Sequence, residues 1–182
     1  MSPSSPSFSR RIPEGEERLR HVCDHCGFVD YRNPRVVVGA VCSFEDRVLL
    51  CRRAIEPRLG YWTIPSGFLE LGESCAEGAA RETREEAGVE IEIDALLALY
   101  DVPRIGHVHL IYRARLPGAE LAPGPESAEA SLFAWPEIPW RRLAFPSVLW
   151  SLRRFDEVRG QTSFPPARNP GPDAAGWREL EG

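Results

Sequence analysis

The sequence predicts a domain of the α/β class, an α/β/α sandwich built on a mixed β-sheet. Two observations predict it: strand-like apolar segments occur both before and after one internal helix, and a second helix closes the domain. The 182 residues are enough for one medium-sized domain with short tails. A hydrophobic content of 43% and a charged content of 27% place the chain among ordinary soluble globular proteins.

The predicted strands are recognised by their apolar and β-branched residues. Residues 35–42 are β-branched and apolar and predict a buried strand. A turn at residues 44–46 joins this strand to a hairpin partner at 47–52. Three further strands are predicted at residues 89–100, 106–116 and 130–135.

Local capping signals mark both helices. Ser74 and Glu77 form a capping box that opens a helix, and this helix should run to Ala87 with Gly88 as its C-terminal cap. Residues 145–159, which contain a proline in their first turn, predict the closing helix.

Charge and hydropathy exclude several classes of partner. A net charge of -5 argues against a broad basic surface for nucleic acid. The longest apolar run, residues 36–42, is far too short to span a bilayer, and the first residues lack the apolar stretch of a secretory signal. We therefore expect a cytoplasmic protein with no membrane partner and with its five cysteines reduced.

The internal helix carries three carboxylates on one side. Glu82, Glu85 and Glu86 are separated by three and four residues, and Arg81 can pair with Glu85. At 5 Å, two such charges repel by about 3 kcal/mol at an effective dielectric of 20. A divalent cation reverses the sign, and hard oxygen ligands suit Mg²⁺ or Mn²⁺. The alternative is a solvated acidic helix face.

The segment from Gly67 to Val89 resembles the Nudix box, whose pattern is G-x5-E-x7-R-E-U-x-E-E-x-G-U with U apolar. Thr83 fills the first U position and is a mild departure. The matching residues are Gly67, Glu73, Arg81, Glu82, Glu85, Glu86, Gly88 and Val89. The chain is thus identified as a member of the Nudix hydrolases, with a resemblance that extends from Cys23 to Arg159.

The resemblance implies roles for these residues. Glu82, Glu85 and Glu86, with the carbonyl of Gly67, would ligate Mg²⁺, and Arg81 would orient Glu85. The metal would activate a water molecule that attacks phosphorus, so no protein nucleophile is required. Glu73 would support the junction between loop and helix.

Many Nudix enzymes take one more glutamate, as base or ligand, from a loop distant in sequence. Here the candidates are Glu126 and Glu129, which are three residues apart and precede a predicted strand. The alternative is an acidic surface loop.

The resemblance also indicates the substrate. The chain looks most like the Nudix branch that acts on FAD and ADP-ribose, and Pro103, 15 residues after Gly88, is a mark of ADP-ribose pyrophosphatases. The S-Q-P-W-P-F-P motif of NADH pyrophosphatases is absent, which argues against reduced NADH. The alternatives are another Nudix substrate (a nucleoside triphosphate, NAD(H) or coenzyme A) and a non-catalytic nucleotide-sensing module. The resemblance also allows a homodimer, because Nudix family members are often homodimers.

Candidate substrate-binding residues lie around the predicted hairpin. Tyr61 or Phe68 could stack on adenine or flavin, as could Trp62, for which core packing is favoured. Arg52 or Arg53 could hold a phosphate, although an exposed hairpin charge is the equal alternative.

Two histidines share one face of the strand at 106–116. His107 and His109 alternate with apolar residues, so they could line the cleft. Such alternation is more commonly explained by one face of the sheet being exposed to solvent.

The sequence divides into four segments. Residues 1–20 are predicted to be mobile, 21–34 to be the remnant of a zinc-ribbon knuckle, 35–160 to form the Nudix domain and 161–182 to be a flexible tail. A zinc ribbon needs four ligands, commonly two C-x2-C pairs. Only Cys23 and Cys26 are present here, and relatives carry the second pair before residues 11–15, so we expect no zinc.

Overall fold

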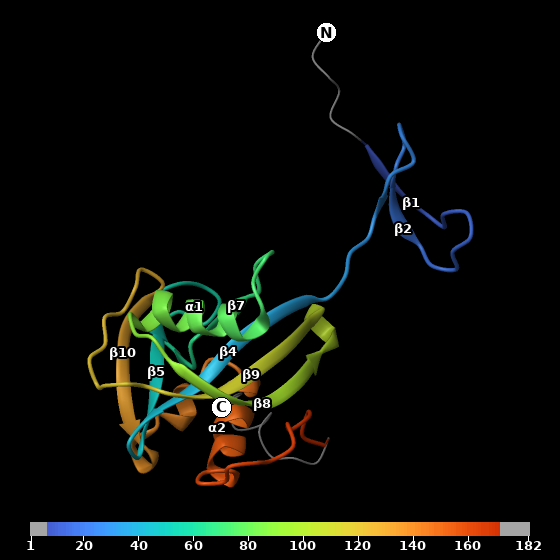
Figure 1. Ribbon diagram of the computed structural model, residues 1–182. Coiled ribbons are helices and arrows are strands. Elements are labelled where there is room, and N and C mark those ends of the chain that lie inside the picture. The colour runs from blue at the N-terminus through green and yellow to red at the C-terminus, as the bar shows by residue number, and fades with distance from the viewer. Residues whose placement is uncertain (1–6, 172–182) are drawn as a thin grey trace. The chain divides into compact units, whose positions relative to one another are not determined.

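The computed structural model describes residues 7–171 (Figure 1). The chain divides into two compact units, Met1–Pro34 and Arg35–Gly182. None of the helices described between residues 7 and 171 is both long and apolar enough to cross a membrane.

The N-terminal unit contains a three-stranded antiparallel sheet. Its strands, in the order β1-β2-β3, are β1 (Phe8–Arg11), β2 (Arg20–Cys23) and β3 (Val29–Asp30). Phe8 pairs with Cys23 across the first two strands, so residues 8–11 are held in a sheet where the sequence indicated a mobile segment. Backbone pairing between distant strands leaves no local signal, which is why the sequence did not reveal it.

The larger unit contains a mixed seven-stranded sheet, as predicted. Its central order is β10-β5-β4-β9-β8; β4 and β9 run parallel and the remaining pairs are antiparallel. The strands are β4 (Arg35–Phe44), β5 (Arg47–Arg53), β6 (Trp62–Thr63), β7 (Ser66–Phe68), β8 (Glu92–Val102), β9 (His107–Arg115) and β10 (Ser127–Ala134).

The sheet splits between β4 and β5. These strands pair only at Ser43 and Phe44, beside the hairpin turn. Farther from the turn, β6 pairs with β5 and β7 pairs with β4. The short segment that contains β6 and β7 therefore runs through the split.

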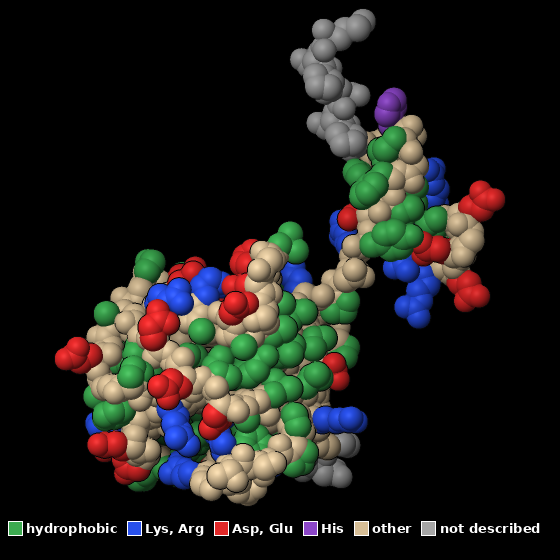
Figure 2. All heavy atoms as spheres, viewed as in Figure 1, with side chains coloured by type: hydrophobic (Ala, Val, Ile, Leu, Met, Phe, Trp, Pro, Cys, Tyr) green, Lys and Arg blue, Asp and Glu red, His purple; other side chains and the backbone are tan. Residues whose placement is uncertain are grey.

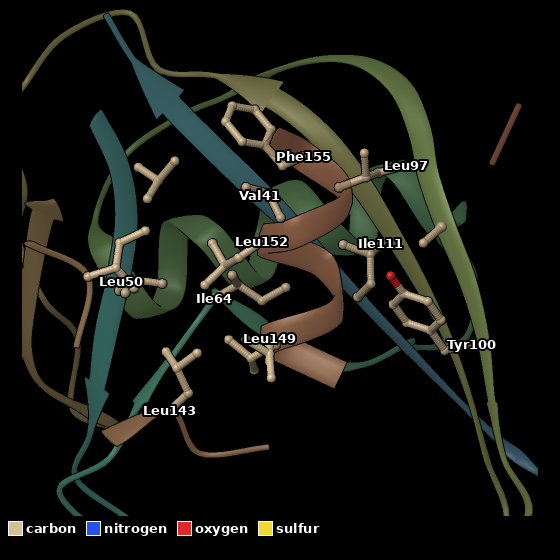
Figure 3. Packing of buried hydrophobic residues seen from close by; sticks show 14 of the residues in the cluster. Val41, Leu50, Ile64, Leu97, Tyr100, Ile111, Leu143, Leu149, Leu152 and Phe155 are labelled. Atoms are coloured by element: carbon tan, nitrogen blue, oxygen red, sulfur yellow. The ribbon is translucent and has the colours of Figure 1, made fainter. Parts of the chain in front are cut away.

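Two α-helices cover opposite faces of this sheet. Helix α2 (Pro146–Glu157) buries Leu149, Leu152 and Phe155 against one face (Figure 3). Helix α1 (Cys75–Ala87) covers the other face, where Ala87 joins a separate apolar cluster. The α/β/α sandwich is therefore confirmed.

The capping signals predicted for α1 are present. The Ser74 hydroxyl accepts a hydrogen bond from the backbone N–H of Glu77, and the Glu77 carboxylate accepts one from the N–H of Ser74. Gly88 ends the helix in the left-handed conformation with φ of 69°. Three short 3₁₀ helices complete the fold: η1 (Pro103–Ile105), η2 (Trp135–Glu137) and η3 (Trp140–Arg142).

Residues 161–171 lie along the edge strand β8, where the sequence indicated a flexible tail. The N–H of Leu99 donates to the carbonyl of Ala167, whose own N–H donates to Leu97. Asn169 exchanges two hydrogen bonds with the backbone of Asp101. The rest of the predicted tail, 172–182, lies outside the described residues.

Candidate active site

Arg81 is the centre of an ionic network at the start of the acidic face of α1. Its Nη1 donates to Glu82 at 2.7 Å and to Glu85 at 3.1 Å. Its Nε and Nη2 bind the two oxygens of Glu73, and Nη2 also donates to the carbonyl of Phe68. These bonds lower the pKa of Glu73 to about 2. One guanidinium therefore ties helix, preceding loop and β7 together.

Glu86 is the most buried of the three predicted carboxylates. It is 8% exposed, and its Oε2 has no hydrogen-bond partner among residues 7–171. Burial raises the pKa of Glu86 to about 8, with a further rise from the charge of Glu82 and an opposing effect from Arg53. An unpaired buried carboxylate oxygen costs free energy unless a proton or a cation satisfies it.

Glu82 lies against the backbone of β7. A Cβ atom added at Gly67 would collide with the Glu82 carboxylate, so only glycine lets helix and strand approach this closely. Burial raises the pKa of Glu82 as well, against the effect of Arg81. Glu85 differs: its side chain is 58% exposed and turns outwards to Arg81. The predicted trio thus consists of two inward carboxylates and one outward carboxylate.

The loop before β10 docks on the C-terminal end of α1. The N–H of Ala122 donates to the carbonyl of Ala87, and a Cβ atom at Gly124 would collide with the carbonyl oxygen of Glu85. This contact brings Glu126 close enough for its charge to raise the pKa of both Glu82 and Glu86.

Glu129, the second candidate from this loop, interacts with other residues. Glu129 forms an ion pair with Arg52 at 3.1 Å and accepts a hydrogen bond from Ser131. Of the two loop candidates, Glu126 is therefore the one that lies near the α1 carboxylates. Glu129 pairs with Arg52 instead.

The donor set suits a hard divalent cation, although its members are not gathered for one. Among the described residues, no group of three His, Cys, Asp or Glu forms a ready metal site. Glu82 and Glu85 form ion pairs with Arg81. The unpaired oxygen of Glu86 and the close approach of Gly67 to Glu82 nonetheless fit a cation bound by oxygen ligands. Figure 2 shows acidic and basic side chains gathered over α1.

The two hairpin arginines have different surroundings. Arg53 donates to the carbonyl of Pro57 at 2.7 Å, lies 5.3 Å from the centre of the Phe145 ring, and lowers the pKa of Glu86. Arg52 is engaged with Glu129 instead. Of the two predicted phosphate-binding residues, only Arg53 is placed beside the carboxylates.

The aromatic candidates also have different surroundings. Trp62 packs edge-on against Phe133 at 4.9 Å in the core, as the packing interpretation had it. Tyr61 instead contacts the guanidinium groups of Arg58 and Arg142, whose central carbons are each 5.3 Å from its ring centre. Sequence reasoning missed both arginines, because they come from a loop and from η3 with no local motif.

Phe68 is exposed at the end of β7. The residue is 41% exposed, the guanidinium carbon of Arg35 lies 5.1 Å from its ring centre, and the His107 ring lies edge-on at 5.2 Å. His109 lies beside His107, and its Nε2 is buried without a partner within residues 7–171. Sequence reasoning did not single out Arg35.

A hollow of about 170 Å³ lies elsewhere in the larger unit, next to the hairpin turn of β4. The ion pair between Arg113 and Asp94 lines it. The α1 carboxylates lie over β7, which pairs with the opposite half of β4 at Val37–Gly39. The hollow is therefore separate from the site.

The geometry defines a class of protein: an α/β/α sandwich whose arginine-anchored acidic helix turns buried carboxylates towards a glycine of the central sheet. The chain belongs to the Nudix hydrolase family, since the NUDIX domain matches residues 32–151, most of its length. The Nudix N-terminal zinc-ribbon family matches residues 5–32.

Three similar proteins agree with this assignment. A crystal structure of a NUDIX hydrolase from Nitrosomonas europaea is 42% identical, with a TM-score of 0.85 over 93% of this chain and 97% of that one. An ADP-ribose pyrophosphatase from Methanocaldococcus jannaschii is 33% identical over 63% of this chain and 69% of its own. An NAD-capped RNA hydrolase, NudC, from Pseudomonas aeruginosa is 31% identical over 74% of this chain and 49% of its own.

The zinc-ribbon knuckle is half formed. Cys23 is buried, Cys26 is exposed, and both are free thiols. Backbone N–H groups of Cys26 and His25 point to the Cys23 sulfur and lower its pKa, an arrangement that suits a thiolate. Within the described residues no third ligand joins them, so the absence of zinc stays a prediction.

Proposed function

We propose that this Nudix hydrolase cleaves the pyrophosphate bond of a nucleoside diphosphate linked to another moiety, with FAD and ADP-ribose as the first candidates. The observation that carries the proposal is the buried, unpaired carboxylate oxygen of Glu86 beside Glu82 and the Gly67 backbone. Similarity to an ADP-ribose pyrophosphatase from Methanocaldococcus jannaschii supports the substrate class.

The carboxylates of Glu82, Glu85 and Glu86, with the carbonyl of Gly67, would hold Mg²⁺ or Mn²⁺. A divalent cation bound there supplies an acidified water and neutralises charge on the diphosphate. Arg81 keeps Glu82 and Glu85 on the same side of α1 through hydrogen bonds of 2.7 Å and 3.1 Å.

Two further residues act on the substrate in this proposal. Water attacks one phosphorus, the bond from that phosphorus to the bridging oxygen breaks, and two monophosphates leave. Glu126, whose charge acts on Glu82 and Glu86, would take the proton that the water releases. Arg53, which acts on Glu86 from β5, would hold a phosphate oxygen.

A panel of diphosphate substrates with Mg²⁺ tests the proposal, with products separated by chromatography. FAD should give FMN and AMP, and ADP-ribose should give AMP and ribose 5-phosphate. NAD, NAD-capped RNA, coenzyme A and nucleoside triphosphates complete the panel, because the chain also resembles NudC. Turnover of coenzyme A or of triphosphates alone would reject the proposed substrate class.

A further inference from the structure

Strand β8 forms one edge of the larger sheet, and residues 161–171, called the strap from here on, bond to its outer side. Ala167 is the point of contact, since it forms a parallel bridge with Ala98. Its N–H donates to the carbonyl of Leu97 at 3.0 Å, and its carbonyl accepts from the N–H of Leu99 at 2.9 Å. The strap therefore uses backbone groups that a further strand would otherwise need.

A side chain of the strap extends this cover along the edge. The Asn169 side-chain oxygen accepts from the N–H of Asp101 at 2.8 Å, and its amide nitrogen donates to the carbonyl of Asp101 at 2.7 Å. An asparagine amide that both donates and accepts copies the bonding of a paired strand residue. The β8 edge is thus covered from Leu97 to Asp101.

Two arginines fasten the strap to the rest of the larger unit. The central carbons of Arg113 and Arg154 lie 4.6 Å and 5.6 Å from the ring centre of Phe164. Arg113 also donates to the carbonyl of Gln161 at 2.9 Å, and Arg154 donates to the carbonyl of Pro165 at 2.7 Å. The strap is therefore fixed by its own contacts before it reaches the β8 edge.

The covered part of β8 is the part best suited to pairing with another strand. Both register shifts against β9 occur before Ala98 or end there, and the pairing then continues regularly to Val102. Residues 95–100 contain no charge, proline or glycine. Bulges and charges discourage strand addition at an edge, whereas a regular, uncharged stretch invites it. Leu99, 36% exposed, adds an apolar side chain to this stretch.

The outer side of the strap has the opposite character. Because the N–H and carbonyl of Ala167 face β8, those of its neighbours Pro166 and Arg168 face away. Proline has no N–H to offer a further strand, and a charged side chain disfavours pairing; both are typical of protected edges. The strap thus ends the sheet at a place where β8 alone would allow it to continue.

We propose that the β8 edge from Leu97 to Asp101 is a pairing surface for the same edge of a second copy of this chain, and that the strap keeps it closed. Two identical edges are self-complementary when they pair antiparallel about a two-fold axis. In a pair centred on Leu99, Asp101 lies opposite Leu97 of the second copy, so the two carboxylates do not face each other. The proposal is independent of the catalytic function.

The test opens the strap in the full-length chain with the double variant Ala167→Pro/Asn169→Ala, which removes the bonds to Leu97 and Asp101. Hydrogen exchange at the amides of Leu99 and Asp101 should rise at least about tenfold. In sedimentation velocity, the mass should double relative to wild type as concentration rises. Asn169→Ala alone, which leaves the strap backbone intact, should show both changes to a smaller degree.

Two further variants make the result specific. Arg168→Pro is the matched control, because the N–H that it removes faces away from β8; exchange and mass should stay as in wild type. Leu99→Lys added to the double variant should abolish the doubling, since two ammonium groups would then face each other across the two-fold axis.

Three results would overturn the proposal. Doubling that persists with Leu99→Lys would place the association elsewhere on the chain. Rapid exchange at Leu99 and Asp101 without any rise in mass would show that the open edge does not pair with itself. Unchanged exchange in the double variant would show that the strap does not close the edge.

Discussion

Helices α1 and α2 are of nearly equal length and cover opposite faces of one sheet, but different forces hold them. Helix α2 buries large apolar side chains, among them Leu149, Leu152 and Phe155. Helix α1 buries only small residues and one carboxylate, and its caps and the bonds of Arg81 also hold it; the buried residues are Gly78, Ala79, Thr83, Glu86 and Ala87. A helix that carries several carboxylates on one side cannot also present a broad apolar stripe on that side. The difference separates a helix held by large buried apolar side chains from one held by caps, ion pairs and small buried residues.

The largest expected effect is on α2. Leu152→Ala should lower the free energy of unfolding by about 2–5 kcal/mol, because Leu152 is fully buried and its truncation leaves a cavity. Urea denaturation measures this change. Asp156→Ala on the exposed side of α2 is the control and should cost no more than about 1 kcal/mol. Similar losses in both variants would contradict the assignment of α2 as the apolar anchor.

The matching change on α1 should affect activity rather than stability. Glu86→Gln keeps the shape of the side chain but removes a carboxylate that would bind the cation, so turnover of the best substrate with Mg²⁺ should fall at least about a hundredfold. The free energy of unfolding in EDTA should stay equal or rise, since an unpaired buried carboxylate is lost. A protein that loses stability but retains turnover would show that Glu86 is structural.

Burial at the sheet end occupied by Phe68 predicts a dependence on pH. Desolvation, with the charge of His107, lowers the pKa of His109 to about 4 from 6.5. The unfolded chain therefore binds the proton first, and the free energy of unfolding should fall as pH drops from about 6.5 to 4. The partial exposure of His109 limits this to the order of 1 kcal/mol. Urea titrations of wild type and His109→Gln across this range should diverge, and parallel curves would contradict the assignment.

The smallest effect concerns the caps of α1. Ser74→Ala removes the hydroxyl that accepts from the N–H of Glu77 and should cost about 1 kcal/mol. Ser163→Ala, at an exposed position outside the helices, should change nothing measurable. An unaffected free energy of unfolding in Ser74→Ala would mean that packing and Arg81 suffice to hold α1.

Much of this protein could be predicted from local patterns. Helix α1 from its Ser74 cap to Gly88, the hairpin of β4 and β5, and the spacing of Glu82, Glu85 and Glu86 all depend on residues within a few turns of one another. The order of the sheet, the split filled by β6 and β7, and the packing of residues 161–171 on β8 depend on pairing between distant segments.

The sequence by itself determined the acidic helix, its caps and the family to which the chain belongs, because helix signals and motif spacing are short-range. Only the tertiary structure decided that Glu86 is buried while Glu85 turns outwards, and that Glu126 rather than Glu129 joins them. It also brought Arg35 to Phe68 and Arg142 to Tyr61. Burial and contacts between distant residues arise only when the layers pack, so no local pattern of side chains encodes them.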